Sequence, residues 1–171
     1  MLIKILSFAL LQSICVNSAL YDRCLDSNHV AMTFDDGPNE NTKELVNILD
    51  KEGVLGAFFI NGIHVERNTK YTDFLKSMHA TGHVIASHTL SHPALGKLNS
   101  FNVYRELYDN EFIMRRSLGI RPRYFRPPYF DYNDQIFDIA ATNFGYDIIM
   151  SKVVVRDWEK ENSVQETHQD Y

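Results

Sequence analysis

The stretch NTKELVNILDKEGVLGAFFI, residues 41–60, contains one copy of the unit that predicts the fold. In its first half the apolar residues recur at helical spacing, Asn41 and Glu44 have the spacing of a capping box, and Gly53 follows as a stop signal. Its second half, Gly56–Ile60, is a short apolar run typical of a strand. Helices that stop at a glycine just before an apolar strand are typical of parallel α/β sheets.

The same unit recurs along the chain. Further strand-like runs are residues 29–34, 82–87, 122–126 and 146–150. Further helical patterns are residues 71–80, 101–118 and 133–144, and each stops at a glycine before the next strand. Strands that are continuously apolar are buried on both faces. The sequence therefore predicts the α/β class, with a parallel sheet that is either open or curled into a barrel.

Composition and charge fit one globular domain. The chain has 171 residues, of which 44% are hydrophobic and 23% charged, and its formal net charge is −5. This length is sufficient for a single hydrophobic core. No basic stripe indicates binding to nucleic acid.

Residues 1–18 have the pattern of a secretory signal peptide, with Lys4 before an apolar run and small residues before Ala19. The alternative is a membrane anchor, but the apolar run is shorter than the roughly 20 residues that span a bilayer. We therefore expect a secreted or cell-wall domain of residues 19–171. Its single Cys24 is then a buried thiol, an intermolecular bridge, or half of a disulfide whose partner is missing from this chain.

Polar motifs stand where three of the predicted strands end. They are TFDDGP (residues 33–38), SHTLSH (residues 87–92) and RPPYF (residues 126–130). Functional groups of parallel α/β folds gather at the carboxyl ends of the strands. We therefore expect these three segments to converge on one rim of the sheet.

The residues of these motifs can bind a cation. His88 and His92 are four residues apart, so one helical turn or a tight loop can point both imidazoles at one atom, and Asp36 or Asp35 completes a set of two histidines and one carboxylate. The other aspartate would then be free to take a proton from a metal-activated water. The alternative for an isolated HxxxH motif is a pair of surface histidines.

The third motif supplies a positive charge and a backbone donor. Arg126 has a planar fork suited to orienting a carboxylate such as Asp35, and the alternative is an ordinary surface arginine. Pro127 and Pro128 lack an N–H group, so the next backbone donor is that of Tyr129. Such a donor can stabilise an oxyanion.

In their order and separations, TFDDGP, SHTLSHP, FRPPY and RDW resemble the NodB-type polysaccharide deacetylases of carbohydrate esterase family four, which include chitin and peptidoglycan deacetylases. The resemblance covers residues 29–158. It implies a distorted, incomplete (β/α) barrel and metal-dependent removal of acetyl groups from N-acetylated glycans. It also implies roles for individual residues: catalytic base Asp35; ligands Asp36, His88 and His92 for a divalent ion, zinc or alternatively cobalt; Arg126 to orient the base; Tyr129 as oxyanion donor and substrate contact; Asp157 and Trp158 to support the catalytic acid and to wall the sugar groove.

The chain departs from this family pattern in several places. Phe130 stands where a glycine is usual, and Val154 where an acidic residue is usual. The family's general-acid histidine follows a late apolar strand, whereas His168 has no such strand around it. We therefore expect either a fragment that lacks the last strands or a relative that binds carbohydrate without turnover. A metallo-hydrolase of peptides or small amides is a third alternative, and the order of the motifs argues against it.

Overall fold

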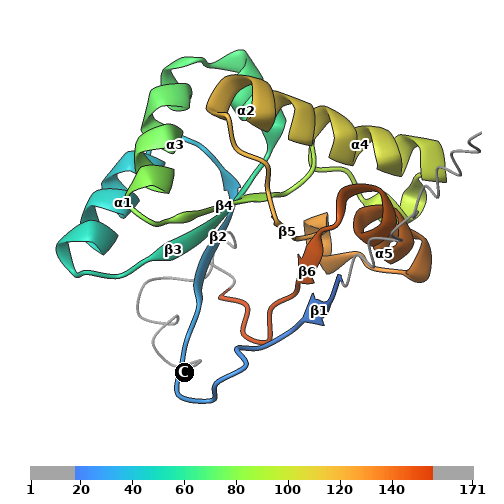
Figure 1. The fold of residues 1–171 in the computed structure, drawn as a ribbon, viewed down its shortest axis with the longest axis horizontal. Coiled ribbons are helices and arrows are strands. Elements are labelled where there is room, and N and C mark those ends of the chain that lie inside the picture. The colour runs from blue at the N-terminus through green and yellow to red at the C-terminus, as the bar shows by residue number, and fades with distance from the viewer. Residues whose placement is uncertain (1–17, 156–171) are drawn as a thin grey trace, which may run out of the picture.

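A computed structural model describes residues 18–155, which form a six-stranded sheet with helices along its outer side (Figure 1). The strand order is β1-β6-β5-β4-β3-β2, and every neighbouring pair is parallel. The strands are β1 Leu20–Tyr21, β2 Met32–Gly37, β3 Gly56–Ile60, β4 Val84–Ser87, β5 Tyr124–Phe125 and β6 Asp147–Ile149. The prediction of a parallel α/β sheet is confirmed. Within the described residues β1 and β2 are its two edges, so the barrel is incomplete.

The helices follow the predicted alternation, with one addition. They are α1 Thr42–Lys51, α2 Gly62–Arg67, α3 Lys70–Ala80, α4 Ser100–Ile113 and α5 Asp134–Ile139. Helix α4 continues into the π-type turn η2 Met114–Leu118, and α5 into η4 Ala140–Phe144; η1 Leu95–Lys97 and η3 Pro128–Phe130 are single 3-10 turns. Neither α2 nor β1 was predicted, because six and two residues are too short for a periodic pattern. None of the described helices is long and apolar enough to cross a membrane.

The predicted capping box at the start of α1 is wrong. Asn41 has helical backbone angles, and its side chain makes no capping hydrogen bond. The side chain of Asn39 takes this role, because its Oδ1 accepts from the N–H groups of Asn41 at 2.9 Å and of Thr42 at 3.1 Å. The side chain that caps α1 therefore lies two residues earlier than predicted.

Side chains on both faces of β3 are buried, which explains why its sequence is continuously apolar. Successive side chains of a strand point to opposite faces of the sheet. Phe58 stacks on Phe34 in the core beneath α1 and α3, with ring centroids 5.1 Å apart. Phe59 is also buried, and it contacts Arg126 and His88, which belong to the rim described below. One strand therefore supplies both the core and the floor of the candidate site.

His83 is a satisfied core histidine. It is buried at the start of β4, where its Nδ1 accepts from the N–H of Gly56 at 3.0 Å and its Nε2 lies 3.0 Å from Asp50 Oδ1. The edge of its ring contacts Phe58. The imidazole thus joins β3 and β4 to helix α1.

We predict that His83→Ala lowers the free energy of unfolding by about 2–4 kcal/mol, because it opens a cavity and leaves the Gly56 N–H without a partner. Urea unfolding followed by circular dichroism measures this change. His79→Ala is the matched control, since His79 is exposed on α3, and it should change the free energy by less than about 0.5 kcal/mol. Equal stability of the two variants would contradict the prediction.

Candidate metal centre

Asp35 and Asp36 lie at the carboxyl end of β2, where the strand is irregular. Its pairing with β3 shifts register between Phe34 and Gly37, and Asp36 has a left-handed φ of 63°. In a regular strand these adjacent side chains would point to opposite faces. A bulge re-aims side chains, and here Asp36 reaches two histidines while Asp35 reaches Arg126.

His88 and His92 are brought together by a tight loop, not by a helical turn. Thr89 and His92 have left-handed φ values of 69° and 63°, and the N–H of His92 donates to Thr89 Oγ1 at 3.0 Å. Glu106 of α4 accepts from the N–H and the hydroxyl of Ser91 at 2.9 and 2.7 Å. The loop is therefore tied to helix α4 between the two histidines.

Asp36, His88 and His92 form a compact cluster. Their candidate ligand atoms all lie within 4.8 Å of one another, with Asp36 Oδ1 3.4 Å from His88 Nε2 and 3.1 Å from His92 Nε2. The His88 side chain is 3% exposed, that of His92 26%, and that of Asp36 64%. The cluster thus has a buried side and an open side that faces solvent.

The surroundings orient His88 and lower the pKa values of Asp36 and His92. His88 Nδ1 lies 2.7 Å from the carbonyl oxygen of Arg126, so Nδ1 donates to this oxygen and Nε2 is the ring nitrogen that faces the cluster. The hydrogen bond with His88, followed by the charge of His92, holds the pKa of Asp36 below its usual range. Burial lowers the pKa of His92, although the charge of Asp36 acts in the opposite direction. An ionised carboxylate and neutral imidazoles are the metal-binding forms.

Arg126 holds Asp35 apart from this cluster. Its side chain is only 4% exposed, and Nη1 donates to Asp35 Oδ1 at 2.8 Å and to Thr33 Oγ1 at 3.0 Å. Nε donates to the carbonyl oxygen of Ile149 at 3.1 Å. The ring centroid of Phe59 lies 4.1 Å from the guanidinium carbon. Thr33, Ile149 and Phe59 fix the arginine, and nothing in their sequence patterns marks them for this task.

Tyr129 lies at the rim beside the cluster. Its side chain projects into solvent with 68% exposure, and the edge of its ring packs against His92 with centroids 4.6 Å apart. Tyr129 and Phe130 both have left-handed φ values, of 58° and 53°. Asp157 and Trp158 lie outside the described residues, so their predicted roles stay predictions.

Two buried amides support the ends of β3 and β4 beneath the cluster. Asn61 Nδ2 donates to the carbonyl oxygen of His88. Asn110 Nδ2 donates to Ser87 Oγ at 2.8 Å and to the carbonyl oxygen of Ile60 at 3.3 Å. Sequence reasoning missed both, because an isolated asparagine in an apolar pattern carries no signal that distinguishes it from an exposed one.

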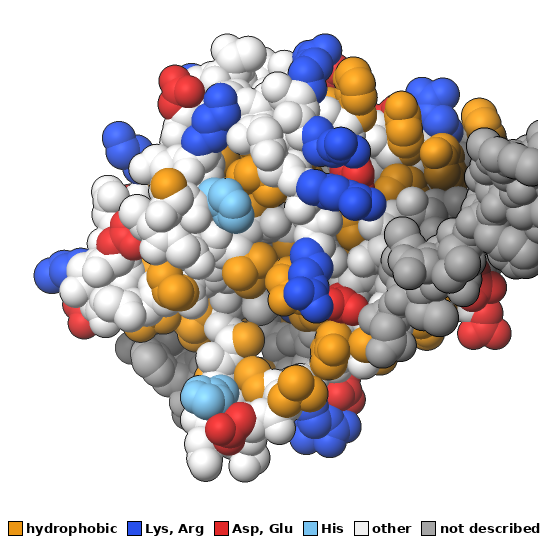
Figure 2. Space-filling view, viewed as in Figure 1, with side chains coloured by type: hydrophobic (Ala, Val, Ile, Leu, Met, Phe, Trp, Pro, Cys, Tyr) orange, Lys and Arg blue, Asp and Glu red, His pale blue; other side chains and the backbone are white. Residues whose placement is uncertain are grey.

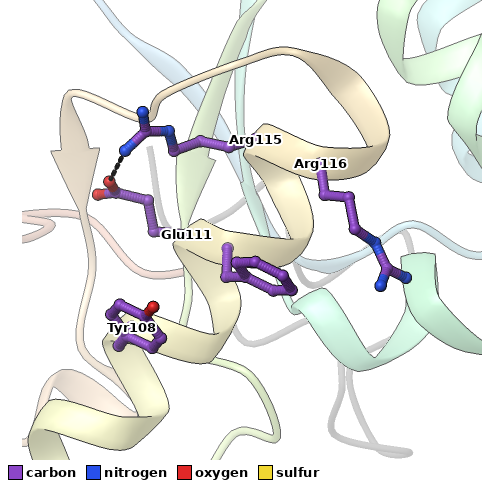
Figure 3. Close-up of a pocket in the computed structure, with 5 residues that line it drawn as sticks. Tyr108, Glu111, Arg115 and Arg116 are labelled. Atoms are coloured by element: carbon purple, nitrogen blue, oxygen red, sulfur yellow. Dashed lines mark hydrogen bonds and ion pairs between the residues drawn. The ribbon is translucent and has the colours of Figure 1, made fainter.

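Two cavities of the described surface are lined by residues outside the cluster. A cavity of about 380 Å³ lies between the turn after β2 and helix α2, and includes His64 and Arg67 in its lining. A second cavity of about 360 Å³ lies beside the carboxyl end of α4, where Glu111 pairs with Arg115 (Figure 3). In the upper part of Figure 2, Lys and Arg side chains lie next to hydrophobic ones.

The second cavity does not contain the candidate metal-binding cluster. Glu111 accepts from the hydroxyl of Tyr146 at 3.0 Å, and burial raises the pKa of Tyr146, which keeps this hydroxyl protonated. The Glu111 carboxylate therefore has internal partners. None of the residues that line this cavity belongs to the cluster.

These observations define a parallel α/β domain with a candidate metal centre at the carboxyl ends of its strands. Residues 22–149 match the family model described as polysaccharide deacetylase, and the chain belongs to this family. It is 36% identical over 139 residues to a chitin deacetylase of Arthroderma benhamiae, which covers 81% of this chain and 37% of that protein. It is 34% identical over 131 residues to a peptidoglycan-N-acetylglucosamine deacetylase of Bacillus cereus, which covers 76% of this chain and 46% of that protein.

The fold comparison agrees with the sequence comparison. The structure of the chitin deacetylase from Colletotrichum lindemuthianum has a TM-score of 0.81 and 31% sequence identity, with 89% of this chain and 67% of that chain covered. The predicted fold class, an incomplete barrel of the polysaccharide deacetylase type, is thereby confirmed. The present chain spans less than half the length of the Arthroderma and Bacillus relatives.

Proposed function

We propose that this chain belongs to a secreted, metal-dependent hydrolase that removes N-acetyl groups from amino-sugar polymers such as chitin or peptidoglycan. One observation carries the proposal: a cluster suited to a divalent cation stands beside Asp35, a second carboxylate that Arg126 holds outside the cluster. A purely structural cation site has no need of such a free base. The deacetylases among the relatives support the class of substrate.

The residues present fit a divalent cation. Asp36, His88 and His92 would hold it, since two imidazoles and one carboxylate are a donor set that zinc uses at hydrolytic sites. The open side of the cluster leaves room for water and substrate. When bound, such a cation polarises a carbonyl group and makes a water molecule more acidic. We propose zinc, with cobalt as the alternative.

The protein's own groups then perform the proton transfer. Asp35 takes a proton from the water whose oxygen attacks the acetyl carbonyl carbon, and the C–N bond breaks to give acetate and an amine. Arg126 keeps the Asp35 carboxylate in place. We propose that the Tyr129 N–H donates to the oxyanion, and that Asp157 and Trp158 support the acid that protonates the amine and line the sugar groove.

The test is acetate release from chitin oligomers and from peptidoglycan fragments, with Zn²⁺ or Co²⁺ added. We expect release that requires the metal and that stops when a chelator removes it. Absence of acetate from both substrates in metal-loaded protein would defeat the proposal. Glycan binding without acetate release would instead indicate a carbohydrate-binding relative.

A further inference from the structure

The loop that follows β5 contacts three different parts of the rim through three successive residues. The Tyr129 ring packs on His92, and the Phe130 ring lies 5.6 Å from the guanidinium carbon of Arg126. Asp131 Oδ2 accepts from the N–H of Gly96 in η1 at 2.7 Å. The middle residue of the three therefore contacts the side chain that holds Asp35.

The backbone of this loop is unfavourable for the residues it contains. Tyr129 and Phe130 both have backbone angles in the left-handed region, which residues other than glycine rarely adopt. Such conformations persist where surrounding contacts hold them, and they concentrate at functional sites. Glycine would remove the strain at position 130, whereas this chain places a large aromatic ring there. The contacts of that ring are its evident compensation.

The partly buried ring of Phe130 lies 5.6 Å from the guanidinium carbon of Arg126. Two aromatic rings contact the guanidinium, and Phe59 is buried whereas Phe130 is only partly buried. A cation within about 6 Å of an aromatic ring centroid is attracted to the ring, most strongly where water is excluded. Arg126 is almost completely buried, so water is largely excluded from its contact with the Phe130 ring.

We propose that Phe130 is a positioning residue that fixes the plane of the Arg126 guanidinium and, through it, the carboxylate of Asp35. Nη1 of Arg126 is shared between Asp35 and Thr33, so a tilt of the guanidinium changes both hydrogen bonds. Asp35 has no other ion-pair partner in the described part of the chain. The effect of Phe130 on the reaction rate depends on the proposed function, whereas its effect on Arg126 does not.

The first experiment measures Arg126 without any need for catalysis. In ¹⁵N-labelled protein, the solvent exchange rate of the Arg126 Nε–H reports how firmly it is held against Ile149. Phe130→Leu keeps an apolar side chain but removes the ring, and we expect exchange to rise about 5- to 10-fold, whereas Phe130→Tyr keeps the wild-type rate. If Phe130→Leu does not fold, Phe130→Gly replaces it, since glycine adopts this φ without strain.

The matched control is Tyr132→Leu, which removes a partly exposed aromatic ring from the same loop. The Tyr132 ring contacts Phe137 and not Arg126. We expect it to leave the exchange rate unchanged. Unchanged exchange in both Phe130→Leu and Phe130→Gly would overturn the proposal. So would faster exchange in Phe130→Tyr equal to that in Phe130→Leu, because the ring would then not be responsible.

The second experiment measures acetate release in the same variants. We expect Phe130→Leu to lower kcat about 5- to 10-fold with KM unchanged, and Phe130→Tyr to keep the wild-type kcat. A change in KM alone would show that the ring contacts substrate instead, which contradicts a role in positioning. If the wild type releases no acetate, the proposed function fails, and the exchange rates still decide the role of Phe130.

Discussion

Asp35→Asn is expected to lower kcat for acetate release by about 10²–10⁴-fold while leaving the affinity for Zn²⁺ unchanged. Asparagine has the size of aspartate, and its Oδ1 can still accept the hydrogen bond from Arg126 Nη1. It cannot take a proton from water at neutral pH. The loss is therefore confined to the proton transfer. Steady-state kinetics with chitin oligomers and calorimetric titration with Zn²⁺ measure the two quantities on the same protein.

Asp36→Asn is the matched variant, one residue away and with the same chemical change. It removes a charge from the cluster with His88 and His92, so its main effect should be weaker Zn²⁺ binding. We therefore expect Asp35→Asn to lower kcat without weakening Zn²⁺ binding, and Asp36→Asn to weaken Zn²⁺ binding. If Asp35→Asn weakened Zn²⁺ binding and Asp36→Asn did not, the proposed roles would be exchanged.

The sequence located the rim because its motifs are local and follow strands. Strand ends can be found from apolar runs bounded by turn residues, and parallel topology brings those ends to one edge. Asp36, His88 and His92 therefore meet in the structure although 56 residues of sequence separate the first from the last. No tertiary information was needed to place them on the same rim.

The support beneath the rim could not be predicted in this way. The bulge that separates the directions of Asp35 and Asp36 is a backbone irregularity with no residue signature of its own. Asn61 and Asn110 act through buried hydrogen bonds to distant strands, which a single sequence does not encode as a pattern. Phe59 reads as a core residue, which it also is, and its contact with Arg126 emerges only when β3 and β5 lie in one sheet. Long-range contacts, not local propensities, account for these omissions.

His88→Ala is expected to abolish the stabilisation that Zn²⁺ gives to the wild-type protein. A ligand that binds only the folded state stabilises it by about 2.7 kcal/mol at 100 times its Kd, and this gain appears as a rise in Tm with added metal. His88 is the most buried member of the cluster, and its Nδ1 is fixed by the carbonyl oxygen of Arg126. Alanine removes the ligand atom with the best-defined position, so neither the rise in Tm nor acetate release should remain.

The control for this prediction is His64→Ala. His64 lies near enough for its charge to contribute to the lowered pKa of Asp36, but it is outside the cluster of candidate ligands. Its variant should keep most of the rise in Tm that Zn²⁺ produces. A comparison with and without metal separates this effect from any loss of stability that the substitutions cause by themselves. If His88→Ala kept the metal-dependent rise in Tm and His64→Ala lost it, the cation would bind elsewhere, and Asp35 would no longer stand beside the reacting water.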